Sequence, residues 1–237
     1  MNDRRKGSVV VFGKDVNDAI LPTIKKVYIG ISQNPDLDVE IILIDDGSSI
    51  PLTSSLPMDI RNKIITVRLE QSKGIGDAFI EGSLKACHDS VLFLPGHDFY
   101  STSAVTRALN LLGTCPVVIG YRSNQQHRPL IKRVSSYTFR KVLKLRIGKF
   151  VVDPHGLPIY PKRVVLKYLP RNARHALHIY ILQALKDMNL ETIQFSAPIN
   201  PDYSEALLNG PRSYLAYMRN VWSVIRILFR PVRGING

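Results

Sequence analysis

Short, nearly continuous runs of apolar residues recur along the first half of the chain. Each run is rich in Val, Ile and Leu, and polar or glycine-containing segments separate it from the next. Runs of this kind are typical of strands in a parallel sheet that is covered on both faces. The pattern predicts strands at 8–13, 39–45, 63–67, 90–94 and 116–120, with a later one at 191–196.

Between these runs, apolar residues follow a helical spacing. The clearest stripe consists of Val16, Ile20, Ile24, Val27 and Ile31. Segments 77–87 and 103–112 show similar patterns, and a further helix is expected near 174–188. Alternation of strands and helices predicts an α/β fold, a Rossmann-like, mostly parallel sheet flanked by helices. Ligands of such folds bind at the carboxyl ends of the strands.

The character of the chain changes after residue 120. Segment 128–149 is basic and helical in pattern, and a proline-rich stretch follows at 153–164. The last segment, 206–237, predicts a basic amphipathic helix that forms a C-terminal extension. An apolar face with Trp222 beside several arginines is typical of a helix at a membrane interface. A terminal helix packed on the domain is the alternative.

The net charge restricts the partners. Thirty-two Lys and Arg against 19 Asp and Glu give a formal charge of +13, which indicates a polyanionic partner. Nucleic acid is disfavoured, because the sequence has no zinc-ligand spacing, RNA-binding signature or helix-turn-helix pattern. An anionic lipid surface and a phosphate-bearing acceptor account for the charge together.

Cysteine usage and hydropathy indicate the compartment. Cys87 and Cys115 lie in or beside apolar runs, which favours reduced thiols over a disulfide. The apolar run near the N-terminus is too short for a signal peptide, and no stretch approaches about 18 uninterrupted apolar residues. We expect a cytoplasmic protein, peripheral on the inner face of the cell membrane.

Ionisable side chains and glycines follow the predicted strands. Asp45 and Asp46 end one strand, where one carboxylate can accept hydrogen bonds from a ribose or base while the other approaches a metal. Lys73 and the glycines after it precede a helix, a setting that suits a phosphate. His97 and Asp98 end another strand. An ordinary turn is the alternative interpretation for each segment.

In their order, these segments resemble the motifs of family 2 glycosyltransferases, nearest the branch of dolichyl-phosphate mannosyltransferases and related polyprenyl sugar transferases. The resemblance spans about residues 8–168 and rests on "VVVFGKDVNDAILP", "VEIILIDDGSS", "SKGIGDAFIEGSLKACHDSVLFLPGHD", "PVVIGYRS" and "VVDPHGLPIYPKRVV". It implies a GT-A domain over 1–205, with a nucleotide-binding half at 1–100 and an acceptor-binding half at 101–205. The implied reaction is inverting transfer of a hexosyl group from a nucleotide diphosphate sugar to a polyprenyl-phosphate or glycan acceptor, in cell-surface polysaccharide or glycolipid synthesis.

The resemblance also assigns the donor site. It implies contacts with the nucleotide sugar from Phe12, Asp15, Asp45, Asp46, Lys73, Gly74 and Gly96. Residues 95–98 match a metal-binding Asp-x-Asp stretch, but Pro95 and His97 replace its acids. His97 and Asp98 are therefore the candidate ligands of Mn²⁺ or Mg²⁺, and Asp98 is also a candidate catalytic residue. Without a metal, Lys73, Arg122 and Arg128 would stabilise the diphosphate.

The acceptor half carries the candidate base. Asp153 matches the family's acid there, and it would take the proton of an attacking hydroxyl, with His155 as second candidate. A phosphate acceptor is already anionic and needs no strong base. Arg122, Arg128 and His155 are expected to bind the acceptor or its phosphate. The alternative is a degenerate relative that binds sugar nucleotides without turnover, since Val16 stands where the family carries a glutamate.

Overall fold

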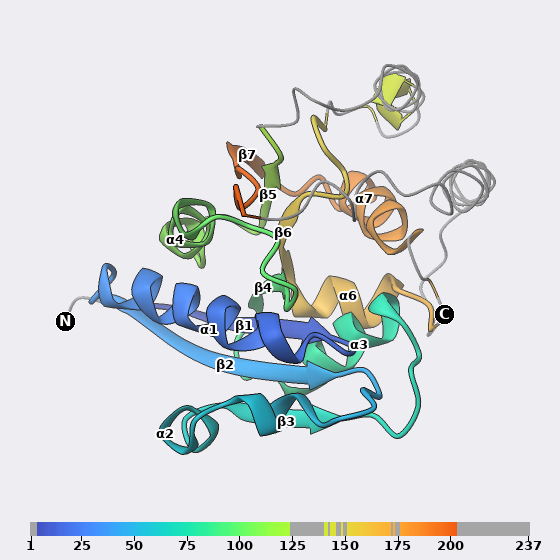
Figure 1. The fold of residues 1–237 in the computed structure, drawn as a ribbon. Coiled ribbons are helices and arrows are strands. Elements are labelled where there is room, and N and C mark those ends of the chain that lie inside the picture. Colours follow the sequence, from blue (N-terminus) through green and yellow to red (C-terminus); the bar gives the residue numbers. More distant parts are fainter. Residues whose placement is uncertain are drawn as a thin grey trace.

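The computed structural model describes residues 4–123, 140–141, 143–145, 148, 151–171, 173 and 176–202. These residues form a seven-stranded sheet of order β3-β2-β1-β4-β6-β5-β7 (Figure 1). The strands are β1 (Arg5–Gly13), β2 (Leu37–Asp45), β3 (Ile65–Arg68), β4 (Ser90–Pro95), β5 (Val117–Tyr121), β6 (Leu157–Pro161) and β7 (Thr192–Ser196). All pairings are parallel except those of β6, which runs antiparallel to β4 and β5.

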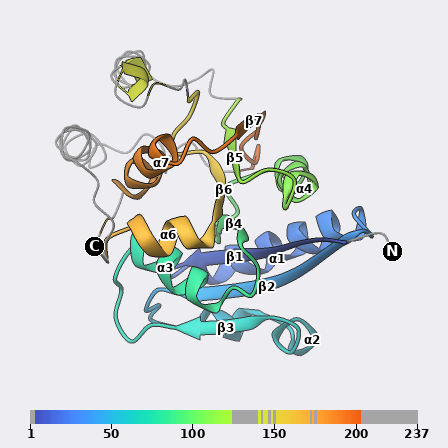
Figure 2. The ribbon, with the colours of Figure 1, turned by 180° about the vertical axis from the view of Figure 1, so that it is seen from behind.

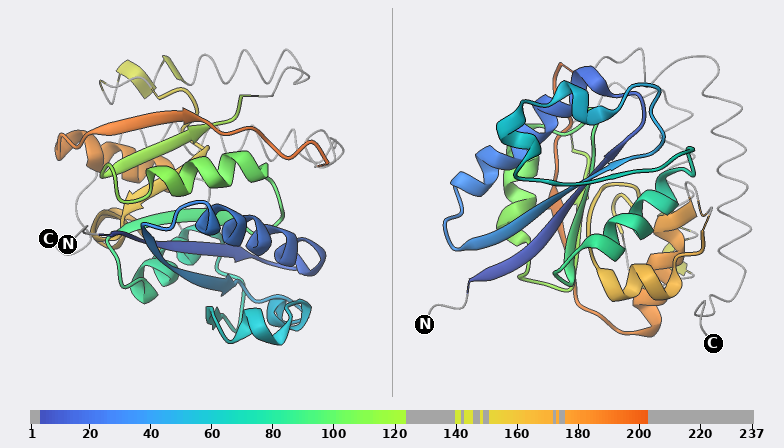
Figure 3. Two further views of the ribbon diagram at one scale, coloured as in Figure 1. Left: turned by 90° about the vertical axis from the view of Figure 1, so that its left-hand side faces the viewer. Right: turned by 90° about the horizontal axis from the view of Figure 1, so that it is seen from below.

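Helices cover both faces of the sheet (Figures 2 and 3). The helices are α1 (Asn17–Ser32), α2 (Met58–Arg61), α3 (Ile75–Lys85), α4 (Thr102–Leu111), α6 (Lys162–Tyr168) and α7 (Leu177–Asp187), with a short 3₁₀ helix η1 at Leu52–Ser55. Alternate strand residues pack against α1 and α4 on one face and against α3, α6 and α7 on the other. Burial on both faces explains why the strands read as continuous apolar runs.

The predicted fold class is confirmed, because a mostly parallel sheet lies between helical layers. Each predicted strand is present, with ends shifted by one to three residues at most. No strand was predicted within the proline-rich stretch 153–164, yet β6 lies inside it between β4 and β5. Pro158 and Pro161 hid this strand from the sequence pattern, because proline is rare in central strands.

The strand register brings three carboxyl ends together. Gly13 of β1 is opposite Asp45 of β2, and Phe12 is opposite Pro95 of β4. The segments that follow these strands therefore share one edge of the sheet.

The predicted helix at 206–237, Arg128 and most of the basic segment 128–149 lie outside the described residues. Among the residues that the structure does describe, no helix is long and apolar enough to cross a membrane.

Candidate active site

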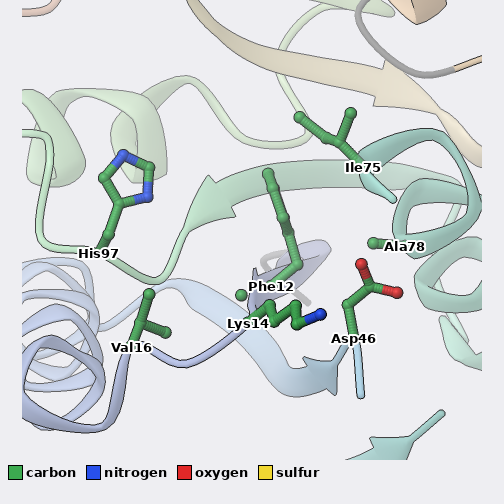
Figure 4. Close-up of a pocket in the computed structure, with 8 residues that line it drawn as sticks. Phe12, Lys14, Val16, Asp46, Ile75, Ala78 and His97 are labelled. Carbon is green, nitrogen blue, oxygen red and sulfur yellow. The ribbon is translucent and has the colours of Figure 1, made fainter. Parts of the chain in front are cut away.

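A pocket of about 380 Å³ opens at the carboxyl ends of β1, β2 and β4 (Figure 4). Its wall is formed by Phe12, Gly13, Lys14, Val16, Asp46, Ile75, Ala78 and His97. Figure 4 shows His97 and Val16 on one side of Phe12, and Asp46, Ile75 and Ala78 on the other. The pocket therefore combines a largely apolar wall with one lysine, one carboxylate and one imidazole.

Asp46 anchors the loop that leads into α3. Its carboxylate accepts hydrogen bonds from Ser72 Oγ at 2.8 Å, Lys73 N at 2.8 Å and Gly74 N at 3.0 Å. Gly74 precedes α3 with a φ of +91°, a conformation that glycine adopts without strain. The first turn of α3 is thereby held at the pocket, where the N-terminal end of a helix suits a phosphate.

Asp45 and Asp15 hold the loop after β2. The Asp45 carboxylate accepts from Ser48 N at 2.9 Å and Leu52 N at 3.0 Å, and it is almost fully buried. Asp15 Oδ1 accepts from Ser49 N at 2.8 Å. Neither aspartate is among the pocket-lining residues, so their contacts with a nucleotide stay predictions.

The turn after β4 separates its two ionisable side chains. His97 lines the pocket, and burial lowers the pKa of its imidazole, against the opposing charge of Asp98. The ring is therefore mostly neutral at pH 7, the form that ligates metals. The Asp98 carboxylate pairs instead with Lys26, with 2.6 Å between Oδ1 and Nζ.

Arg122 and Asp153 form a second cluster. Arg122 follows β5, and its Nε and Nη2 donate to the two Asp153 carboxylate oxygens at 2.5 Å and 2.8 Å. A close approach of the backbones brings the two residues together. A Cβ on Gly156 would lie 1.9 Å from the carbonyl oxygen of Gly120, so glycine is required there.

The Arg122 pair sets the protonation state of Asp153. Burial alone would raise the pKa of this carboxyl, but the charge and hydrogen bonds of Arg122 outweigh burial and lower it to about 2. Tyr100 lies near the pair, and burial raises the pKa of its hydroxyl. Asp153 is thus a stable anion and a weak proton acceptor at neutral pH.

The remaining candidate residues, Lys73, Gly96 and His155, are not among the residues that line the pocket. Lys73 is exposed beside the anchored loop, and Gly96 donates its N–H to Phe12 O at 2.8 Å in the floor of the turn. The His155 ring lies 5.5 Å from the ring of buried His178, whose Nδ1 is 3.2 Å from Tyr160 Oη. Of the predicted donor-site residues, Phe12, Asp46 and His97 line the pocket together.

Five lining residues had not been assigned to the site from the sequence, namely Gly13, Lys14, Val16, Ile75 and Ala78. Lys14, Ile75 and Ala78 join Phe12 and Asp46 around the pocket. Ile75 and Ala78 belong to the first turn of α3, directly after the glycine-containing loop. Their place after that loop was the available signal, because a helix that starts at a strand-end loop turns its first residues toward the ligand.

The donor atoms at the pocket allow for one weakly held cation. No group of three or more His, Cys, Asp or Glu side chains arranged for a metal occurs within the described part of the chain. Asp46 is occupied by three hydrogen bonds, and Pro95 and Gly96 offer no side-chain donor. The residues therefore fit a cation that is held mainly by oxygen atoms of a bound small molecule, with His97 as its contact in the protein. Mn²⁺ accepts imidazole more readily than Mg²⁺ does.

Comparisons in sequence give one family match. A family model described as glycosyl transferase family 2 matches residues 8–168. No curated protein sequence matches the chain.

Several solved structures share the fold. Glucosyl-3-phosphoglycerate synthase from Mycobacterium tuberculosis, in complex with Mn²⁺, UDP and glucosyl-3-phosphoglycerate, is 19% identical with a TM-score of 0.64, and the match covers 93% of this chain and 77% of that one. Mannosyl-3-phosphoglycerate synthase from Rubrobacter xylanophilus is 14% identical with a TM-score of 0.69, covering 94% and 72%. TarS 1–349 from S. aureus is 16% identical with a TM-score of 0.53, covering 81% and 58%. These likenesses confirm the predicted GT-A fold.

Proposed function

The chain belongs to glycosyl transferase family 2, and we propose that it transfers a sugar from a nucleotide diphosphate sugar to a phosphate-bearing acceptor. The observation that carries the proposal is the pocket at the carboxyl ends of β1, β2 and β4. In doubly wound sheets, nucleotides bind at this edge. The apolar wall of Phe12, Ile75 and Ala78 suits a base or sugar face, and Lys14 with the first turn of α3 suits a diphosphate.

The leaving diphosphate requires positive charge around it. In an inverting displacement, an acceptor oxygen attacks the anomeric carbon, the new C–O bond forms, and the electron pair of the old bond passes to the diphosphate. A divalent cation at the diphosphate neutralises that charge when bound. The M. tuberculosis synthase was solved with Mn²⁺ or Mg²⁺ together with UDP, which supports a divalent cation here, with His97 as its protein contact. Lys14 adds charge on the same wall.

The state of Asp153 favours an acceptor that is already ionised. A hydroxyl nucleophile must lose its proton, and a carboxylate with a pKa of about 2 that is held by Arg122 is a poor base for that step. A phosphate oxygen attacks without a base. Polyprenyl phosphate is the acceptor that the sequence resemblance implies, and its phosphate oxygen would be the nucleophile. Phosphoglyceric acid, which is bound in an M. tuberculosis complex, shares the phosphate but also carries a hydroxyl, so it supports recognition of a phosphate rather than attack by one. Arg122 and His155 are the described residues proposed to face the acceptor.

Attachment to the membrane belongs to the same proposal. The cytoplasmic, peripheral location rests on the charge of +13 and on the predicted helix at 206–237, which lies outside the described residues. A basic amphipathic helix binds an anionic lipid surface. Such a location would bring the pocket to a lipid-linked phosphate.

A thermal-shift screen with sugar nucleotides tests donor binding. Derivatives of UDP and GDP are added with and without Mn²⁺, and one class is expected to raise the melting temperature, most strongly with Mn²⁺. Stabilisation without subsequent transfer would identify a degenerate relative. If no sugar nucleotide stabilises the protein and RNA binds tightly instead, the proposal is wrong.

A further inference from the structure

The turn at 96–98 is tied to helix α1. Asp98 has a φ of +56°, a left-handed conformation that is uncommon outside glycine, so its surroundings must hold it there. Its backbone N–H donates to Thr23 Oγ1 at 3.0 Å, and Thr23 Oγ1 lies 3.2 Å from Gly96 O. Thr23 itself is buried on α1. The hydroxyl proton of Thr23 is shared with Ala19 O at 2.9 Å, so its firmest hold on the turn is the bond that it accepts from Asp98 N.

The Asp98 side chain continues this attachment. Oδ1 lies 2.6 Å from Lys26 Nζ, and the side chains of Lys26 and Asp98 are only 14% and 21% exposed. Oδ2 accepts a hydrogen bond from Asn200 Nδ2 at 2.8 Å. Lys26 Nζ also donates to Tyr100 O at 3.1 Å. Oδ2 is thus hydrogen-bonded to the segment after β7, whereas Oδ1 is held by the charge of Lys26 on α1 and accepts no hydrogen bond of good geometry from any described residue.

That segment closes the arrangement from the other side. Asn200 N donates to Phe99 O at 2.8 Å, and Ser101 N donates to Pro198 O at 3.1 Å. Asn200 Nδ2 also lies 3.2 Å from Asp98 O. Asp98 is therefore enclosed between α1 and residues 198–200, whereas His97 lines the pocket.

We propose that Asp98 is a positioning residue: its ion pair with Lys26 holds the turn so that His97 meets the donor, and Asp98 itself does not bind the metal. This assignment replaces the sequence-based expectation for Asp98, and for the identity of the ligand it rests on the proposed function. A cation bound by the Asp98 carboxylate would compete with Lys26 for it, and the largely buried ammonium would then keep its hydrogen bond to Tyr100 O but lose its countercharge.

Lys26→Met and Asp98→Asn distinguish the two roles. Binding of Mn²⁺ in the presence of UDP or GDP is measured by electron paramagnetic resonance. If Asp98 positions His97, both substitutions weaken Mn²⁺ binding by a similar factor of about 10, the usual size for groups that orient a ligand. If Asp98 is a ligand, Asp98→Asn abolishes binding, whereas Lys26→Met releases the carboxylate and leaves binding unchanged or tighter. The second pattern would overturn the proposal.

A second readout needs neither nucleotide nor metal. The ring C–H signals of His97 are recorded by NMR in both variants, and they are expected to shift in both. Lys26→Arg keeps the positive charge and is expected to restore the signals and the Mn²⁺ affinity, which also separates positioning from a failure to fold. Asp89→Asn is the matched control, since Asp89 directly precedes β4 and pairs with the exposed Arg163. This substitution is expected to change neither the His97 signals nor the Mn²⁺ affinity.

Mn²⁺ binding and the His97 NMR signals test different claims, so their negative results can be told apart. If the wild-type protein binds no nucleotide with Mn²⁺, the proposed function is wrong, and the His97 spectra still decide the role of the pair. His97 signals that are unchanged in Lys26→Met and Asp98→Asn would overturn the positioning role, whatever the protein binds.

Discussion

Asp153→Ala is expected to lower the free energy of unfolding by about 3–5 kcal/mol, because it leaves the Arg122 guanidinium largely buried without its partner. Denaturant unfolding at pH 7 measures this loss. The double substitution Arg122→Met with Asp153→Leu is expected to recover most of it, since an apolar pair removes both charges together.

An exposed ion pair supplies the comparison. Asp89→Ala removes the partner of Arg163, whose side chain is 59% exposed, and such pairs are worth about 1 kcal/mol or less. A loss at Asp153 as small as the loss at Asp89 would contradict the assignment of the Arg122–Asp153 pair as a buried structural unit.

The same pair predicts a dependence of stability on pH. The pKa of Asp153 falls from its ordinary value of 3.8 to about 2 in the folded protein. The native state therefore binds the proton less tightly than the unfolded chain. The contribution is fully present above pH 3.8 and is lost as pH falls toward 2. It amounts to about 2 kcal/mol and is measured as the wild-type stability minus that of the apolar double variant across this range.

Asp46→Ala is expected to weaken binding of the sugar nucleotide by about 100-fold. The substitution removes the acceptor of Ser72 Oγ, Lys73 N and Gly74 N, so the loop before α3 loses its anchor at the pocket. Hydrogen bonds to a charged group contribute roughly 1.5–3 kcal/mol each, and a loss of about 3 kcal/mol corresponds to that factor. Isothermal titration calorimetry with the stabilising donor measures the change.

Asp38→Ala on the same strand is the matched control. Asp38 is exposed near the amino end of β2, away from the pocket, and its removal should leave donor affinity within about 2-fold of wild type. Equal affinities for Asp46→Ala and wild type would show that the donor binds elsewhere.

The sheet could be predicted because its strands are buried on both faces, which leaves a continuous apolar signature such as that of β2. The same rule failed for β6, whose strand residues lie between prolines and pair with each neighbour over only three positions. Its place in the sheet depends on β4 and β5, which belong to distant parts of the sequence.

The site was predicted only as far as strand ends locate it. Asp46 and His97 follow β2 and β4 and reach the pocket, as the position of a strand end indicates. The direction of Asp98 depends on Lys26 and on Asn200, which is 102 residues away along the chain. The low pKa of Asp153 likewise depends on Arg122, 31 residues before it. Contacts of this kind are set by tertiary packing, which local patterns do not encode.

Mass-spectrometric detection of the transferred sugar tests the central claim most directly. The protein is incubated with Mn²⁺, the stabilising sugar nucleotide and matched acceptors, namely a short polyprenyl phosphate with its prenol and 3-phosphoglycerate with glycerate. The account predicts a sugar adduct on polyprenyl phosphate, whose oxygen is already ionised, and little or none on the prenol. The pair of 3-phosphoglycerate and glycerate shows whether a phosphate is recognised when the nucleophile is a hydroxyl. Equal transfer to polyprenyl phosphate and to the prenol, or no adduct on any acceptor, would contradict the account.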